Sequence, residues 1–174
     1  MKKQSSLLLI LMLLLVLAGC GAKPAPTEPP ELTVTNAQGA SITARSGSYD
    51  WDYEAGGGQR TSAIACGMHP LDETLRDSTP ALEMPIAVSA SFYYTVTLDF
   101  GDCAPDSVTL RYWNEQCWGD TQATAEKLTV QRQDDGTYTA ELVPSVGIFE
   151  VDAQWDAEDY CGRAFYSFCT KAAE

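Results

Sequence analysis

Basic residues, histidine and metal-ligand motifs are all scarce in this chain. Its 174 residues include 11 Lys and Arg against 24 Asp and Glu, so the formal net charge is −13. Nucleic-acid binding needs lysine and arginine to neutralise phosphates, so no nucleic-acid partner is expected. The single histidine, His69, cannot complete a multi-histidine zinc site, and no two cysteines have C-x-x-C spacing. We therefore expect neither a metal centre nor a cofactor.

Motifs for a catalytic nucleophile are also missing. There is no G-x-S-x-G, and no serine-to-lysine motif of the penicillin-binding type. A Ser-His-Asp triad would have to use His69, which lies in a loop-like stretch beside Pro70. A Cys66–His69 dyad would join residues that are neighbours in sequence, whereas such dyads usually come from distant segments. Glycines 56–58 lack the lysine of a phosphate loop and are typical of a turn. The sequence predicts that the chain is not an enzyme.

Long apolar runs are rare too, and the only one lies near the start of the chain. Leu7 to Leu17 is an uninterrupted run of 11 apolar residues that follows two lysines. This order is typical of an export signal, and the run is shorter than the roughly 20 residues of a membrane span. Residues 17–20, Leu-Ala-Gly-Cys, resemble the lipobox of bacterial lipoprotein precursors. The resemblance implies a signal peptide over 1–19, cleavage before Cys20 and lipidation of the Cys20 thiol.

The lipobox resemblance also implies a place in the cell. The lipidated chain is expected on the outer face of the plasma membrane, or on the outer membrane of a Gram-negative cell. Cleavage removes two of the 11 basic residues and none of the 24 acidic ones, which leaves a net charge of −15. Anionic lipid headgroups would repel so acidic a body, so the lipid anchor itself has to provide the membrane contact.

Proline is concentrated directly after Cys20. Residues 20–31 contain Pro24, Pro26, Pro29 and Pro30. Proline-rich segments favour extended polyproline geometry, in which 11 residues at ~3.1 Å each reach about 30 Å. We expect a linker over 20–31 and a single folded domain over 32–174.

Alternation of apolar and polar residues dominates the rest of the chain. Between residues 92 and 100, and again between 149 and 155, every second residue is apolar. Such a period of two is typical of strands with one buried face. Asp135-Gly136 is typical of a hairpin turn. No sustained helical stripe occurs, so the sequence predicts an all-β domain, with shorter strands at 31–36, 41–44, 48–54, 107–113, 127–133, 137–142 and 163–169.

Two resemblances refine this prediction. Residues 87–170 resemble immunoglobulin-like domains in the order and spacing of their strands, and 142–155 are similar to the turn and penultimate strand of many bacterial members. Most of the chain after Cys20 also resembles small Gram-positive lipoproteins with no agreed activity, through the stretches GSYDWDYE, HPLD, PDSVTLRYW and GIFEVDAQWD. We predict an antiparallel immunoglobulin-like β-sandwich, with residues 87–170 as its immunoglobulin-like half.

Five cysteines follow Cys20, and disulfides are the default outside the cytoplasm. In the immunoglobulin-like strand order, Cys103 and Cys161 lie in two loops at one end of the sandwich. Cys117 and Cys169 lie at the other end, both with side chains on the outer face. On this resemblance we predict Cys103–Cys161 and Cys117–Cys169 bonds and a free Cys66. The alternative is that all five are unpaired thiols.

The acidic loop and two tryptophans are the candidate binding residues. Loop tips of sandwiches often contact partners, which makes a candidate of the loop containing Asp156, Glu158, Asp159 and Tyr160; its alternative is a merely solvated loop. Trp113 has outward parity on its strand, and Trp118 follows in a loop. These two rings are a candidate platform for stacking on a glycan, with core filling as the alternative.

A row of carboxylates lies on one face of the strand at 48–54. Asp50, Asp52 and Glu54 alternate there, so they could hold Ca²⁺ together with loop carbonyls. A hydrolase could instead use Asp50 and Asp52 as a carboxylate pair, provided that both lie in a cleft. The simpler interpretation is a solvated acidic face.

Together these patterns favour a membrane-tethered, extracytoplasmic binding or interaction domain. Its partner beyond the membrane is expected to be an envelope protein or a glycan. A small carboxylate-dependent hydrolase is one alternative. An accessory subunit of a membrane complex is another, which a large exposed apolar patch would support.

Overall fold

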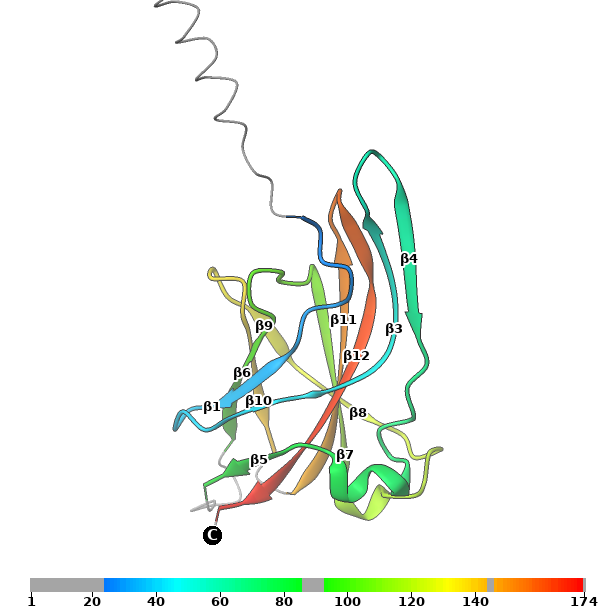
Figure 1. Cartoon of the computed structure of the whole chain (residues 1–174). Coiled ribbons are helices and arrows are strands. Elements are labelled where there is room, and N and C mark those ends of the chain that lie inside the picture. Colours follow the sequence, from blue (N-terminus) through cyan, green and yellow to red (C-terminus); the bar gives the residue numbers. More distant parts are fainter. Residues whose placement is uncertain (1–23, 86–92, 144–145, 174) are drawn as a thin grey trace, which may run out of the picture.

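A computed structural model describes residues 24–85, 93–143 and 146–173 of the chain (Figure 1). Over these residues two β-sheets pack against each other, with two short 3-10 helices beside them. The all-β sandwich is thereby confirmed. No helix within the described ranges is long and apolar enough to cross a membrane. The predicted signal peptide, Cys20 and the start of the immunoglobulin-like half expected from residue 87 lie outside the described residues.

The smaller sheet has five antiparallel strands in the order β2-β1-β6-β10-β9. In the centre of this sheet, Leu98 pairs with Val34 on one side and with Tyr138 on the other, so their side chains form one buried row. The β9–β10 hairpin turns at Gly136, where φ is +87°. This confirms the hairpin predicted from Asp135-Gly136. The strands are β1 Thr33–Asn36, β2 Ser41–Thr43, β6 Tyr94–Asp99, β9 Val130–Arg132 and β10 Tyr138–Leu142.

The larger sheet has seven strands, six of them in the order β4-β3-β12-β11-β7-β8. The seventh, β5, runs parallel to the last part of β12. The β3–β4 hairpin turns at glycines 56–58, all in the left-handed region that glycine adopts without strain. The strands are β3 Arg45–Glu54, β4 Arg60–Ala65, β5 Ala81–Met84, β7 Ser107–Asn114, β8 Glu126–Leu128, β11 Gly147–Asp156 and β12 Tyr160–Ala172; the 3-10 helices are η1 Glu73–Ser78 and η2 Glu115–Cys117.

Seven of the described strands follow the strand order of an immunoglobulin-like domain. Strands β1, β6, β10 and β9 match the A-B-E-D sheet, and β7, β11 and β12 match C-F-G. The short strands β2, β5 and β8 are additional, and the β3–β4 hairpin extends the larger sheet beyond β12 (Figure 1).

The core between the sheets is rich in aromatic rings. Phe149 and Phe168 stack at 4.9 Å between ring centroids, and Trp51 meets Trp155 edge to face at 5.2 Å. Phe100, from the other sheet, packs edge-on against Trp155 at 5.7 Å. All five are inward positions of the alternating pattern, and all are buried.

Part of the proline-rich segment packs onto this core. The indole Nε1 of Trp51 donates a hydrogen bond of 2.8 Å to the carbonyl oxygen of Pro26. The Tyr166 hydroxyl donates one of 2.7 Å to the carbonyl oxygen of Pro30, and burial raises the pKa of that hydroxyl. We call residues 24–31 the proline segment. From Pro26 to Pro30 it is held along the sandwich, which corrects the expectation of a spacer that extends freely up to residue 31.

Candidate functional site

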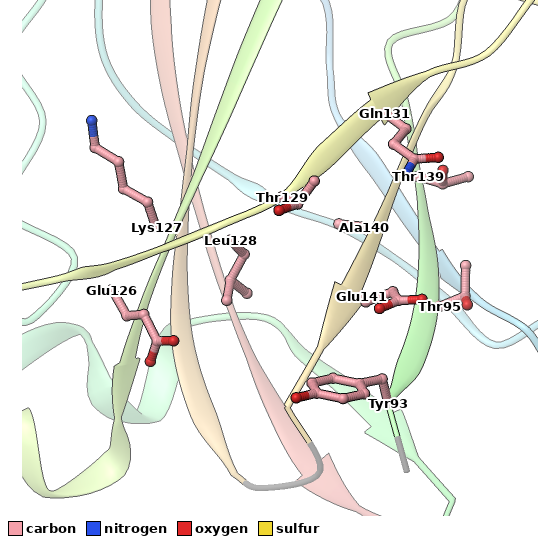
Figure 2. Close-up of a pocket in the computed structure, with 10 residues that line it drawn as sticks. All are labelled: Tyr93, Thr95, Glu126, Lys127, Leu128, Thr129, Gln131, Thr139, Ala140 and Glu141. Carbon is pink, nitrogen blue, oxygen red and sulfur yellow. The ribbon is translucent and has the colours of Figure 1, made fainter. Parts of the chain in front are cut away.

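A hollow of about 510 Å³ lies at one edge of the sandwich (Figure 2). It forms because the chain changes sheets there. Strand β8 pairs with β7 in the larger sheet, β9 pairs with β10 in the smaller one, and only Thr129 separates β8 from β9. A strand that passes from one sheet of a sandwich to the other has to bend at the crossing point, which here is Thr129. The crossing segment forms one wall of the hollow, and strands β6 and β10 form the other.

The wall on β6, β10 and β9 is a strip of polar side chains on the outer face of the smaller sheet. Thr95 pairs with Glu141, and Thr139 pairs with Gln131. Directly opposite residues share a face of a sheet, so these four side chains project to the same side. Tyr93 lies two residues before Thr95 and is 57% exposed. We call these five residues the polar strip.

Most of the strip's polar groups have no hydrogen-bond partner among the residues that the structure describes. In the part of the chain that the structure describes, the side chains of Thr95, Gln131 and Glu141 make no hydrogen bond to another protein group. The Thr139 hydroxyl accepts one from Gln133 Nε2 at 2.9 Å. Lys127 extends away from the other labelled side chains in Figure 2. The strip therefore presents hydroxyl, amide and carboxylate groups beside an exposed aromatic ring, a set suited to a polar ligand.

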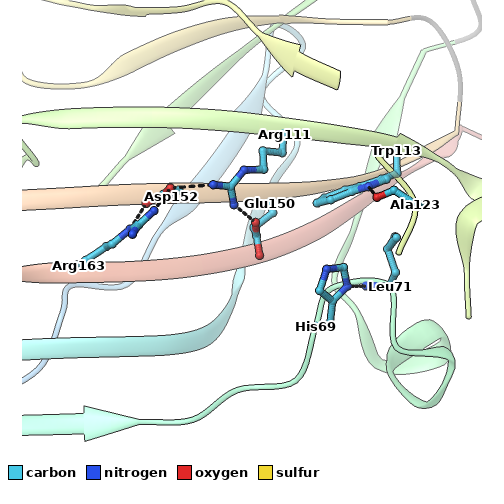
Figure 3. A network of polar contacts seen from close by, with 8 residues as sticks. All are labelled: His69, Leu71, Arg111, Trp113, Ala123, Glu150, Asp152 and Arg163. Atoms are coloured by element: carbon cyan, nitrogen blue, oxygen red, sulfur yellow. Dashed lines mark hydrogen bonds and ion pairs between the residues drawn. The ribbon is translucent and has the colours of Figure 1, made fainter. Parts of the chain in front are cut away.

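The outer face of the larger sheet carries a different arrangement, an ion network (Figure 3). Arg163 donates from Nε and Nη2 to the two carboxylate oxygens of Asp152, at 2.7 and 2.6 Å. Arg111 donates to Asp152 at 3.1 Å and also to Glu150. Asp152 is only 5% exposed, and its hydrogen bonds are the largest cause of the raised pKa of Arg163. Two cations thus face two anions, so the network cross-links β7, β11 and β12.

A smaller hollow of about 280 Å³ lies beside this network. His69 lines it, and the His69 Nδ1 accepts a hydrogen bond of 3.2 Å from the backbone N–H of Leu71. The His69 ring also meets Trp113 edge to face at 5.9 Å. These contacts give His69 a structural role in the segment that crosses this face.

The expected tryptophan platform is wrong, because the outer face around Trp113 is covered. Trp113 is 5% exposed and forms a second small core with Leu71 and Ile148. Its Nε1 donates a hydrogen bond of 3.0 Å to the carbonyl oxygen of Ala123. Trp118 packs partly buried against the same cluster. The alternative of core filling is the correct one.

The structure divides the acidic loop at 156–160. Asp156 and Glu158 are exposed, whereas the carbonyl oxygen of Asp159 accepts a hydrogen bond of 2.8 Å from the backbone N–H of Glu54. Tyr160 stacks on Trp51 at 5.3 Å, and burial is the largest cause that raises its pKa to about 12. Tyr160 therefore belongs to the edge of the core, which leaves the exposed carboxylates of the loop as candidate contacts.

The structure holds all five described cysteines as free thiols, so the predicted Cys103–Cys161 bond is absent from it. Both residues lie at the expected end but on different faces of the larger sheet. Cys161 pairs with the exposed Asp52, and its Sγ accepts a contact of 3.6 Å from Arg60 on the outer face. Cys103 instead interacts with the hydroxyl of Tyr160, whose ring lies on the inner side.

The predicted Cys117–Cys169 bond is also absent from the structure, where the two thiols have different neighbours. Cys169 lies on β12 and pairs with Ile148 on β11, whereas Cys117 lies in η2, beyond the end of β7. The Sγ of Cys169 leans toward β5, 3.6 Å from the carbonyl oxygen of Pro80, whereas that of Cys117 lies 3.5 Å from Asn114 Oδ1.

The carboxylate row on β3 lies away from the polar strip. Asp50 and Asp52 are both exposed on the outer face of the larger sheet, and Asp52 accepts a hydrogen bond from the Ser62 hydroxyl. Neither residue lines the two hollows described above. Over the described ranges no group of three or more His, Cys, Asp or Glu side chains is placed to hold a metal ion.

Sequence reasoning identified none of the polar strip as a site. In the sequence, its residues are the polar positions of the alternating pattern. Threonine, glutamine and glutamate are common at such outward-facing strand positions, so nothing distinguished them as a site. Searches of protein-family models, of curated proteins and of solved structures found no match to this chain.

Proposed function

We propose that this chain is a lipid-anchored binding domain on the outside of the cell and that it acts without catalysis. The anchor would be Cys20, and the domain would be the sandwich that begins with the proline segment. The observation that carries the binding role is the polar strip, where the side chains of Thr95, Gln131 and Glu141, which make no hydrogen bond within the described ranges, line a hollow beside an exposed ring.

The anchor is supported by the sequence from Leu17 to Cys20, which follows an apolar run of 11 residues. Two or more acyl chains hold a protein stably on a bilayer, whereas one chain gives only reversible binding. The partner in the membrane is therefore lipid, reached through the modified cysteine.

The contacts of the proline segment make the connection to the membrane short. Pro26, where the Trp51 hydrogen bond begins to hold the chain, is the sixth residue after Cys20, and a stretch of that length reaches at most about 20 Å. Pro24 shares a hollow of about 590 Å³ with Gly56 and Asp159. The end of the sandwich with the β3–β4 turn and the acidic loop would consequently lie nearest the bilayer.

The anchor is tested by growing cells that express the full chain with an alkyne-bearing palmitate analogue. Wild type should be labelled and should sediment with the membranes. Cys20→Ser should lose the label and leave the membrane fraction. Cys66→Ser, which changes a cysteine that the structure shows to be exposed, is the matched control and should behave as wild type. Labelling that persists in Cys20→Ser, or an unlabelled wild type in the soluble fraction, would refute the anchor.

A further inference from the structure

We propose that the polar strip binds an uncharged polysaccharide chain. Tyr93 would pack its ring against the C–H face of a sugar. The side chains of Thr95, Gln131, Thr139 and Glu141 would exchange hydrogen bonds with sugar hydroxyls. This inference rests on the proposed binding function and names its class of ligand.

The position of the strip on a sheet face favours a saccharide over a peptide. An extended peptide usually binds at a sheet edge, where free backbone groups can pair with it. On the face formed by β6, β10 and β9, strands β6 and β10 are hydrogen-bonded on both sides, and β9, the last strand in the sheet order, is hydrogen-bonded to β10. A ligand lying there has to be recognised by side chains, and those on offer are hydroxyls, an amide and a single carboxylate beside Tyr93 (Figure 2).

The charge of the surroundings excludes acidic polysaccharides. Glu126 and Glu141 line the hollow, and Lys127, its one basic residue, extends away from the other lining side chains. The mature chain adds its net charge of −15. An anionic polymer would be repelled both locally and at a distance, whereas an uncharged one would not.

The spacing of the strip suits a chain rather than an isolated sugar. Tyr93, directly before β6, is two residues from Thr95 on that strand, and Glu141 and Thr139 are two residues apart along β10. Successive outward side chains of a strand repeat about every 7 Å. The strip therefore offers several contact points in a line, each weak, whose effects combine on a polymer with repeating units.

The test is affinity electrophoresis of the full chain, in non-ionic detergent, through native gels that contain one polymer each. The neutral probes are dextran, galactomannan and xyloglucan, and the charged probes are alginate and polylysine. At least one neutral polymer should retard the wild type, and alginate should not. Tyr93→Ala and Gln131→Ala should each weaken the apparent affinity about tenfold. Tyr93→Phe, which keeps the ring, should recover most of the retardation lost in Tyr93→Ala.

Gln154→Ala is the matched control for Gln131→Ala, since Gln154 is an exposed glutamine on β11 of the other sheet. Gln154→Ala should leave the retardation by the neutral polymer unchanged. Added salt should not weaken that retardation, because the ligand carries no charge. The proposal is overturned if no neutral polymer retards the protein, if retardation survives both Tyr93→Ala and Gln131→Ala, or if only polylysine binds in a salt-sensitive way. The gels can be run on Cys20→Ser as well, so a failure of the anchor and a failure of the saccharide site are separate results.

Discussion

Replacing Asp152 with alanine tests the ion network that cross-links the larger sheet. The substitution removes three hydrogen bonds at once, two from Arg163 and one from Arg111, and it leaves two guanidinium groups without this carboxylate. Arg111 keeps its bond to Glu150. Asp152 is buried, so the lost contacts lie at the protected base of the network.

The expected loss of stability is about 2–3 kcal/mol. Breaking a fully buried ion pair costs about 3–5 kcal/mol, and an exposed pair contributes about 0–1 kcal/mol. The Arg163 side chain is 42% exposed and that of Arg111 is 27% exposed, so water replaces part of what each cation loses. In a chain of this size, about 1 kcal/mol shifts the Tm by roughly 2–4 °C, so a fall of about 5–10 °C is expected.

The free energy of unfolding is measured by urea denaturation followed by tryptophan fluorescence. Asp156→Ala is the control, because Asp156 is an exposed carboxylate on the same strand, and it should change stability by less than about 0.5 kcal/mol. If Asp152→Ala and Asp156→Ala cost the same, the network contributes nothing beyond ordinary surface charge and this reasoning fails.

Three further predictions concern other parts of the molecule. Trp51→Phe removes the hydrogen bond to Pro26 and should make the proline segment several-fold more sensitive to a nonspecific protease; an unchanged cleavage rate would show that this bond does not hold the segment. Iodoacetamide should label the exposed Cys66 first and Cys169 last, because burial raises the pKa of the Cys169 thiol; mass spectrometry of the native protein over time checks the order, and equal rates would contradict it. The pKa of Tyr160 is about 12 in the folded chain, whereas its ordinary value is 10.0. The stability that depends on the protonated hydroxyl is therefore present below pH 10 and is lost as the pH rises toward 12. Urea midpoints measured at increasing pH should fall less steeply in Tyr160→Phe than in wild type, and parallel curves would contradict this.

Strands with one buried face could be predicted from the sequence. Alternation identified β6, β7, β11 and β12 because their inward residues are large and apolar and their outward residues are polar. Strands β4 and β5 escaped the same reasoning. Strand β4 is largely exposed on both faces, so it carries no alternating signal. Strand β5 alternates, with Leu82 and Met84 buried, but it is only four residues long and pairs in parallel with β12.

Errors about the surface arose where distant segments meet. The prediction that Trp113 lies on the outer face of its strand was correct. Leu71 and Ala123 nevertheless cover its side chain, and they come from segments outside the strands, whose positions an alternating pattern does not predict. The end of the sandwich also did not predict the cysteine pairs. Cys103 and Cys161 lie on different faces of the larger sheet, and the thiols of Cys117 and Cys169 contact different segments. The polar strip depends on the crossing at Thr129, and a continuous strand expected over 127–133 gave no sign that the chain changes sheets there.

The last strand of the chain has a consequence for when the protein can fold. Strand β12, Tyr160–Ala172, lies inside the larger sheet and hydrogen-bonds to β3, β5 and β11, which come from early, middle and late parts of the sequence. Among the described strands the β3–β4 hairpin has no other neighbour in that sheet, so it cannot join the sandwich before β12 has been synthesised. Contacts of such long range also form slowly. The larger sheet of a nascent chain would therefore stay incomplete until β12 is available, which suits a protein that we propose crosses a membrane before it folds.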